Sequence, residues 1–380
     1  MKYLLIICFS VAYSFKHSNQ EKALNTISNT KSLQGFYDRL DSLETNNDEK
    51  VSIVHIGDSH IQADFLTGTV RRNLQQRFGN AGRGFVFPYK IARSGGALDV
   101  LFKHKGSWQY CNIMNNYSSC DIGVAGFTVT PQNNSSFFID VASKAETNSS
   151  FNKITILDVN GSFTPSKAFS NYNISYTNEN TILNFDQLQD SVEIKPLTID
   201  NNFPQLQGLV LENGKSGILY HAIGVNGSST LQYLRSNSFE NQIADLNASL
   251  VIISFGTNDC YLPSSRFCEF CVKERYKTLI KRLRAKNPKI SILLTSPPDH
   301  FYHRKYPNKN IQKLRNAMLQ LVEEENVALW DLYEIMGGER SIQSWRAEDL
   351  ARGDLIHFTK EGYYKQGELL YDALIEPFNK

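Results

Sequence analysis

Short apolar runs alternate with helical periodicity over much of the chain. Residues 51–57 form an apolar, β-branched run that ends in glycine, which is typical of a buried parallel strand. The residues from Ile61 to Phe78 then place apolar side chains at helical spacing. A strand, a tight turn and a helix are therefore expected to meet at residues 57–60.

The same alternation resumes after residue 216. Strands are expected at 217–224, 249–255, 290–295 and 327–332, and helices at 230–246, 272–286, 311–325 and 360–374. Together with the first strand, this pattern predicts an α/β fold with a doubly wound, mainly parallel five-stranded sheet and helices on both faces. Ligands of such sheets bind beyond the carboxyl ends of the strands.

Residues 82–215 differ in composition from the rest of the chain and are rich in Asn, Ser and Thr. Short alternating runs such as 136–141, 153–159 and 191–195 are separated by turn residues, which predicts an all-β sandwich. We therefore expect a discontinuous domain of residues 15–81 and 216–380, with the sandwich of residues 82–215 inserted into it.

The N-terminus has the pattern of a secretory signal. A lysine precedes the apolar run from Tyr3 to Ala12, and small residues follow, so residues 1–14 are predicted to be a signal peptide that directs export to the periplasm, the cell surface or the medium. The run is too short to span a bilayer comfortably, and a buried N-terminal strand or helix is the alternative. Cys8 lacks the small neighbours that a lipoprotein anchor prefers, which disfavours lipidation without excluding it.

Charge and cysteines narrow the classes of partner. The 380 residues include 40 basic and 38 acidic ones, so the net charge of +2 provides no strong field to hold nucleic acid or an anionic membrane. Two cysteine pairings are compatible with the spacing, Cys111 with Cys120 and Cys268 with Cys260 or Cys271. The last three could also supply part of a zinc site, although no fourth ligand is set by spacing. The oligomeric state stays open.

Four polar motifs follow predicted strands or precede the last helix. They are Gly57-Asp58-Ser59-His60, Gly224-Val-Asn-Gly227, Gly256-Thr-Asn-Asp259 and Asp354-Leu-Ile-His357. Each of them alone is compatible with an ordinary turn or helix cap. The carboxyl ends of parallel strands share one edge of a sheet, so together the motifs are expected to surround one point.

The residue types suit acyl transfer. A serine at a helix N-terminus presents its hydroxyl and backbone N–H where negative charge is favoured. Gly227 allows a backbone N–H to approach a substrate oxygen, and Asn258 offers a side-chain N–H to an oxyanion. A carboxylate three residues before a histidine can accept its Nδ1–H, which leaves Nε2 free as a base.

The four motifs, in this order, resemble the serine, glycine, asparagine and histidine blocks of the SGNH (GDSL-like) hydrolase superfamily, over residues 50–80 and 217–375. The resemblance implies a flavodoxin-like sheet with Ser59 as nucleophile, His357 as base and Asp354 as its orienter. It also implies an oxyanion hole made of the Ser59 and Gly227 backbone N–H groups and the Asn258 side chain. His60 departs from the leucine of the family's name motif, which leaves the subfamily in question.

A narrower likeness is to bacterial peptidoglycan O-acetylesterases, some of which carry a carbohydrate-binding-like sandwich between the first and second blocks. It implies a serine esterase that removes O-acetyl groups from a cell-wall or other polysaccharide and needs no metal or organic cofactor. The alternatives are a lipase or thioesterase of the same fold, and a glycan-binding surface protein with a vestigial site. The acyl group and the glycan are not revealed.

Two sets of side chains in or near the inserted segment are candidates for glycan contacts or for structural roles. Aromatic rings can stack on sugars or fill a sandwich core, and arginines can recognise an acidic glycan or lie on a solvated helix face. The aromatic set is Trp108, Tyr110, Tyr117, Phe127 and Phe137, and the basic set is Arg71, Arg72 and Arg83.

Overall fold

The structure is a computed structural model that describes residues 24–46, 49–115, 120–132, 134–141, 149–159, 162–166, 171–177, 180–197 and 204–380. The predicted signal peptide, Cys8 and Tyr117 lie outside the described residues. No helix within these ranges is long and apolar enough to cross a membrane.

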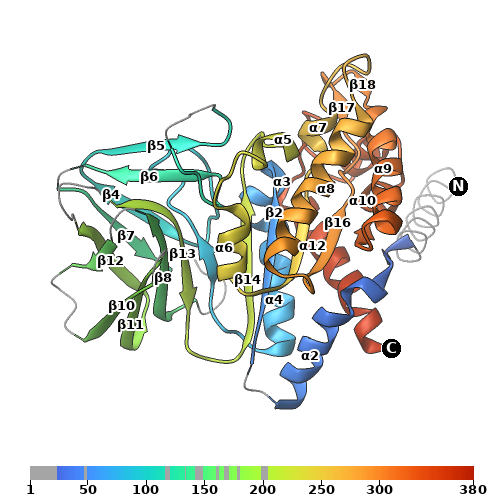
Figure 1. Cartoon of the computed structure of the whole chain (residues 1–380). Helices are drawn as coiled ribbons and strands as arrows, with labels where there is room; N and C mark the ends of the chain where they lie inside the picture. The colour runs from blue at the N-terminus through green and yellow to red at the C-terminus, as the bar shows by residue number, and fades with distance from the viewer. Residues whose placement is uncertain are drawn as a thin grey trace, which may run out of the picture.

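A mixed sheet with helices on both faces confirms the α/β prediction (Figure 1). Its strand order is β1-β19-β16-β15-β2-β14, so the sheet has six strands rather than five. The five strands that the sequence predicts pair in parallel, and the short β1 adds an antiparallel edge. The strands are β1 Ile27–Ser28, β2 Lys50–Gly57, β14 Gly217–Gly224, β15 Ala248–Ser254, β16 Ser291–Thr295 and β19 Ala328–Trp330.

Alternate side chains of these strands enter two separate cores. Ile53 and its same-face neighbours pack with α2, α4 and α12, whereas Val54 and its neighbours pack with α6, α8 and α9. The helices are η1 Thr30–Leu33, α2 Gln34–Asn46, α3 Ser59–Gln62, α4 Phe65–Phe78, α5 Thr230–Tyr233, α6 Phe239–Asp245, α7 Thr257–Cys260, α8 Glu269–Lys286, α9 Asn310–Glu324, α10 Leu332–Met336, α11 Ser341–Ala347, α12 Lys360–Ile375 and η2 Pro377–Asn379.

The helix predicted after β2 is broken into α3 and α4. Asp64 interrupts it with a left-handed backbone, φ +60°. Its carboxylate lies 2.7 Å from the guanidinium of Arg71 and 2.7 Å from that of Arg83, and both arginines also bind Asp99. We call these four buried or largely buried residues the charge cluster. Neither a solvated helix face nor contact with an acidic glycan describes Arg71 and Arg83, because carboxylates of the chain itself hold them.

Strands between β2 and β14 in sequence form an all-β part, named here the β unit, from β3 to β13. One sheet has the order β10-β11-β8-β13-β6-β5, with β3 also on β13, and the other has the order β4-β7-β12-β9. The strands are β3 Gly84–Val86, β4 Leu101–Lys105, β5 Trp108–Asn112, β6 Phe127–Pro131, β7 Ser136–Asp140, β8 Phe151–Val159, β9 Ser162–Pro165, β10 Tyr172–Tyr176, β11 Asn180–Gln189, β12 Ser191–Leu197 and β13 Gln205–Glu212. A small hairpin outside the β unit, between β16 and α9 in sequence, consists of β17 Phe301–Tyr302 and β18 Tyr306–Pro307.

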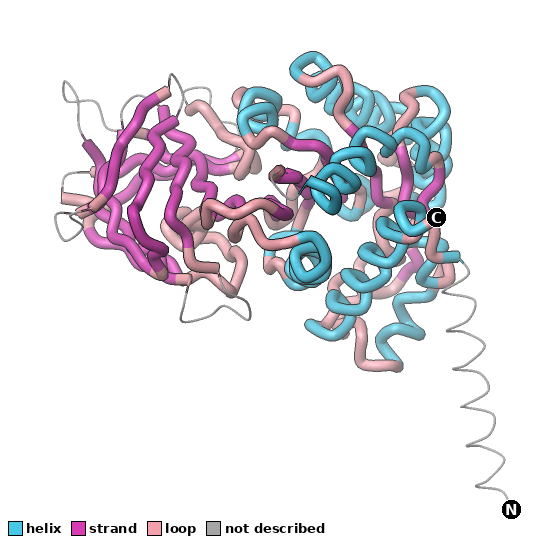
Figure 2. The backbone as a smooth tube through the Cα atoms, turned by 90° about the horizontal axis from the view of Figure 1, so that it is seen from below, coloured by secondary structure: helices cyan, strands magenta, loops and turns pink. Residues whose placement is uncertain are grey.

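The core of the β unit is continuous with one face of the parallel sheet. The strands of the β unit gather at one end of the molecule and most helices at the other (Figure 2). Phe127 and Phe137 are buried in this core, and the Trp108 ring packs edge-on against Phe137. For Phe127 and Phe137 the core-filling interpretation therefore holds rather than sugar stacking, while Trp108 and Tyr110 are only partly buried against the same core.

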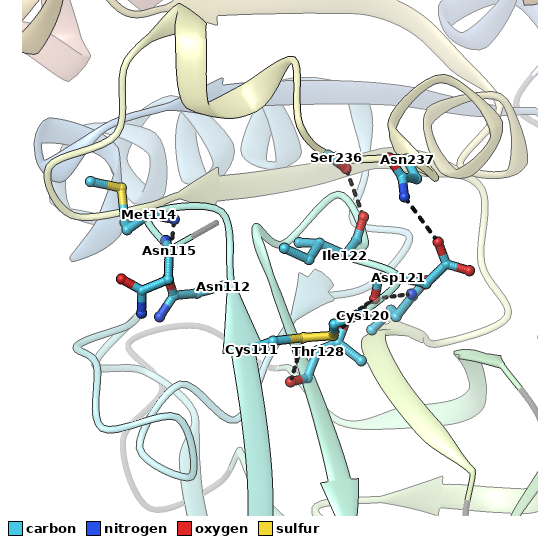
Figure 3. The surroundings of a disulfide bond; sticks show 11 residues. Cys111, Asn112, Met114, Asn115, Cys120, Asp121, Ile122, Thr128, Ser236 and Asn237 are labelled. Carbon is cyan, nitrogen blue, oxygen red and sulfur yellow. Dashed lines mark hydrogen bonds between the residues drawn. A yellow bond between two sulfur atoms is a disulfide. The ribbon is translucent and has the colours of Figure 1, made fainter. Parts of the chain in front are cut away.

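The described cysteines form two disulfides, Cys111–Cys120 and Cys268–Cys271, and Cys260 is buried and free. The Cys111–Cys120 disulfide lies in the region where the β unit meets the segment between α5 and α6 (Figure 3). There Ser236 Oγ donates to the Ile122 carbonyl at 2.9 Å, and Asn237 Nδ2 donates to Asp121 Oδ1 at 3.3 Å. The disulfide thus lies at a junction of the two parts.

Candidate active site

Ser59 stands at the carboxyl end of β2, as the first residue of α3. Asp58 caps this turn, because its Oδ1 accepts the backbone N–H of His60 at 3.0 Å. Gly57 is required just before it, since a Cβ there would lie 2.6 Å from the Ser254 carbonyl oxygen and 2.5 Å from Ile61. The Ser59 amide belongs to the first helical turn, whose N–H groups have no intrahelical acceptor.

Ser59, His357 and Asp354 form a hydrogen-bonded chain. Ser59 Oγ lies 3.1 Å from His357 Nε2, and His357 Nδ1 lies 2.9 Å from Asp354 Oδ2. Since the carboxylate accepts the Nδ1 proton, Nε2 is left facing the hydroxyl as an acceptor. The structure therefore joins three residues that are up to 298 positions apart in sequence.

The loop that carries Asp354 and His357 is a narrow turn between α11 and α12. Ala351 and Phe358 form an isolated antiparallel bridge at its base, and Leu355 at its tip has a left-handed backbone, φ +56°. Asp354 Oδ1 accepts the backbone N–H groups of Ile356 and His357. Burial alone would raise the pKa of Asp354, but these bonds and the one from the His357 ring outweigh it and lower that pKa below its usual value.

Gly227 and Asn258 lie on the turns that follow β14 and β15. β14 and β15 flank β2 in the sheet, so the turns that follow them meet the turn that holds Ser59. Asn258 Nδ2 donates to the Ser228 carbonyl at 2.9 Å and makes a longer contact, 3.4 Å, with Asp58 Oδ2. The amide therefore bridges the residue after Gly227 and the residue before Ser59, and its second proton is only loosely held.

Two aspartates and one histidine around these turns have structural roles. Asp259 accepts the backbone N–H and the hydroxyl of Thr230, which ties α7 to α5. Burial raises the pKa of Asp58 to about 7. His55 is fully buried between Tyr220 and Ser254, as expected of a core histidine, and burial lowers its pKa to about 3.

The side chains of Met114 and Tyr363 make contacts around the site that the sequence did not predict. Gly227 has a left-handed backbone, φ +76°, and a Cβ on it would lie 3.5 Å from Met114 Cε, so the β unit reaches this turn. Tyr363 on α12 binds His60 behind the His357 ring. No sequence motif identifies Met114. Tyr363 follows His357 by six residues, but this spacing predicts a contact with His60 only when the path of the chain between His357 and α12 is known.

A cavity of about 430 Å³ lies beside α3, between that helix and the β unit. Its walls are largely apolar and include Phe85, Phe87 and Leu98, with Gln62 of α3 on one side. Among the described residues, no group of three or more His, Cys, Asp or Glu side chains is arranged to hold a metal ion.

The sequence of residues 200–365 matches the model of the GDSL-like lipase/acylhydrolase family. This stretch includes Gly227, Asn258, Asp354 and His357, while Ser59 lies before it. The resemblance to the SGNH/GDSL superfamily is confirmed. No curated protein matches the sequence of this chain.

Among solved structures, a peptidoglycan O-acetylesterase is similar in fold, with a TM-score of 0.77, 22% sequence identity and coverage of 91% of this chain and 96% of that one. A match of this extent includes much of the β unit. A lipase/acylhydrolase from Enterococcus faecalis (TM-score 0.34, 20% identity, 43% of this chain and 78% of that one) and an acetyl xylan esterase (TM-score 0.34, 19% identity, 41% and 81%) match a smaller part.

Proposed function

We propose that this protein is an exported serine esterase that removes O-acetyl groups from a cell-wall or other polysaccharide, and that residues 82–215 are a carbohydrate-binding-like domain inserted into its hydrolase domain. The single observation that carries the proposal is the hydrogen-bonded chain from Ser59 Oγ through the His357 ring to Asp354. This arrangement prepares a hydroxyl for nucleophilic attack. Acetylated polysaccharide is favoured over other esters by the fold shared with a peptidoglycan O-acetylesterase.

The first half of the reaction forms an acyl-enzyme. Ser59 Oγ attacks the ester carbonyl while His357 Nε2 takes the hydroxyl proton. The oxygen that becomes negative is held by the Ser59 and Gly227 backbone N–H groups and the loosely held proton of Asn258 Nδ2. His357 then gives the proton to the sugar oxygen, which leaves as an alcohol.

The second half restores the enzyme. Water loses a proton to His357 Nε2 and attacks the acetyl-serine carbonyl, the same donors hold the second oxyanion, and acetate leaves as the proton returns to Ser59 Oγ. Asp354 stays ionised throughout, because its hydrogen bonds hold its pKa below the usual value. It keeps the imidazole in the tautomer that the reaction needs.

Acetate release from a panel of O-acetylated glycans, peptidoglycan and xylan among them, tests the proposal. The wild-type protein should release acetate from at least one of them, and Ser59→Ala should release none above background. Ser265→Ala, on an exposed loop, is the matched control and should behave as the wild type. Failure on every acetylated glycan would remove the assignment of substrate.

A fluorophosphonate probe separates an active esterase from a glycan-binding protein with a vestigial site. The probe reacts only with an activated serine. Labelling of the wild type and not of Ser59→Ala supports the esterase, whereas no labelling of either supports the vestigial alternative.

A lipase or thioesterase is the second candidate, and the apolar cavity beside α3 favours it. Such an enzyme would hydrolyse 4-nitrophenyl octanoate faster than 4-nitrophenyl acetate. An acetylesterase would show the opposite order.

A further inference from the structure

His60 follows Ser59 directly and has no part in the reaction steps above. It is 7% exposed, and its ring lies between two partners on other segments. His60 Nδ1 is 3.0 Å from the Tyr363 hydroxyl, and the ring centroid is 5.4 Å from that of His357, with the planes tilted by 36°. The imidazole therefore backs the ring that faces the serine.

His60 is held through one ring nitrogen. The Tyr363 hydroxyl and His60 Nδ1 share one hydrogen bond, and either atom can be its donor, according to the tautomer of the ring. The other ring nitrogen, Nε2, is buried without a hydrogen-bond partner among the described residues, so the bond to Tyr363 is the one that fixes the ring. Burial, and next the charge of His357, lower the pKa of His60 well below its usual value, so the ring is uncharged near neutral pH.

We propose that His60 is a positioning residue: held by the Tyr363 hydroxyl, its ring supports the His357 ring and keeps Nε2 of His357 directed at Ser59 Oγ. The inference rests on the proposed function and names a further pair of residues for the same site. Asp354 anchors His357 at Nδ1, while Nε2 faces Ser59 Oγ, the atom that is acylated during the reaction, so the bond to Asp354 alone would then leave the ring able to rotate. Contact with a second, fixed ring restricts that rotation.

An uncharged ring suits this place because His357 becomes an imidazolium during each half-reaction. A cation beside it would oppose that proton, whereas a neutral ring whose centroid lies 5.4 Å away does not. An aliphatic side chain would fill the space but could not be fixed by a hydroxyl on α12. The bond to Tyr363 therefore carries the effect, and Tyr363 acts through His60.

Tyr363→Phe tests this with the smallest change, since it removes one oxygen and leaves the packing. With 4-nitrophenyl acetate, kcat should fall about tenfold, the size of one lost hydrogen bond, while KM stays within about twofold. The rate of fluorophosphonate labelling of Ser59 should fall by the same factor. Tyr364→Phe is the matched control, because within the described structure both tyrosines pack against Phe65 but only Tyr363 contacts His60, and both constants should remain at the wild-type values.

His60→Phe removes the same bond from its other end and keeps a ring. It should lower kcat about as much as Tyr363→Phe, and the double variant should lose about tenfold rather than about a hundredfold, because both changes break one interaction. His60→Asn, whose side-chain amide can still donate to or accept from the Tyr363 hydroxyl, should recover part of the loss. Melting temperatures of all variants show whether each is folded.

The outcomes separate this inference from the function it rests on. If the wild type is labelled and releases acetate but Tyr363→Phe and His60→Phe keep kcat within twofold, the positioning role is overturned and the esterase stands. Multiplicative losses in the double variant, or losses that follow KM or the melting temperature, also overturn it. Absence of labelling in the wild type overturns both.

Discussion

The two sides of Ser59 are built from different parts of the molecule. The base side, which consists of Asp354, His357, His60 and Tyr363, comes entirely from the segments around α3 and α12, and its hydrogen bonds are 3.1 Å or shorter. In the proposed mechanism the oxyanion forms on the side of Gly227 and Asn258, which we call the oxyanion side, and Met114 of the β unit lies against the Gly227 turn there.

This difference between the two sides suggests that residues of one side determine the rate of the chemical step and residues of the other determine how substrate binds. In the proposed mechanism, proton transfer depends on short hydrogen bonds within one tightly packed part, so we expect the base side to work without the β unit. We expect substrate to contact the oxyanion side, where Met114 of the β unit lies against the Gly227 turn. We therefore expect changes on the base side to alter kcat, and changes at the border with the β unit to alter KM.

The largest expected effect is on the base side. His357→Ala should lower kcat by about 10⁶-fold, because among the described residues His357 is the base hydrogen-bonded to Ser59 Oγ. Single-turnover acetate release measures this loss. A loss as small as that of Asn258→Ala would contradict the division into two sides.

Asn258→Ala should cost less, about 10² to 10³ in kcat, since two backbone donors remain for the oxyanion. KM for a small ester should change little. Steady-state kinetics on 4-nitrophenyl acetate decides this, and a rise in KM without a fall in kcat would place Asn258 outside the oxyanion hole.

Acid should weaken the fold through four buried histidines, one of them on the base side. Burial lowers the pKa of His55 and His221 to about 3 and that of His300 to about 4, and it also lowers that of His60. In the unfolded chain these groups bind protons below pH ~6.5, so stability is lost as the pH falls from there toward the lower values.

Each of these histidines makes unfolding up to about tenfold more favourable per pH unit in that range. Melting temperatures between pH 8 and pH 4 check the sign. His221→Gln should flatten the curve, and the exposed His104→Gln should not. A melting temperature that rises on acidification would contradict this account.

The smallest expected effect is at the border with the β unit. Met114→Ala should raise KM for an acetylated glycan by severalfold, on the order of 1 kcal/mol of lost contact, and leave kcat unchanged. The exposed Leu188→Ala, elsewhere in the β unit, is the control. If Met114→Ala lowers kcat instead, the β unit takes part in the chemistry.

The elements that position the site could be predicted because their signals are local. The five parallel strands are apolar runs, and the rule that their carboxyl ends share an edge brings Ser59, Gly227 and Asn258 together. α2 has a signal of the same local kind, because its apolar residues Phe36, Leu40 and Leu43 lie at helical spacing.

The remaining features depend on contacts between distant segments. The break at Asp64 follows from ion pairs with Arg71 and Arg83, and periodicity carries no information about such pairs. The contact of Met114 with the Gly227 turn depends on how two cores pack, and the bond between His60 and Tyr363 depends on where α12 lies over α3. Local pattern predicts elements and motifs, but not which side chains meet across them.

The charge cluster has a consequence for any attempt to separate the two parts. Asp64 caps α4 and Arg71 lies within it, whereas Arg83 immediately precedes β3 and Asp99 lies between β3 and β4 of the β unit. An excision near residue 82 would leave each fragment with an acid and a base taken from a four-membered network. The β unit is therefore unsuited to transplantation as a free-standing module. A protein that received it would have to supply an acid and a base in place of Asp64 and Arg71.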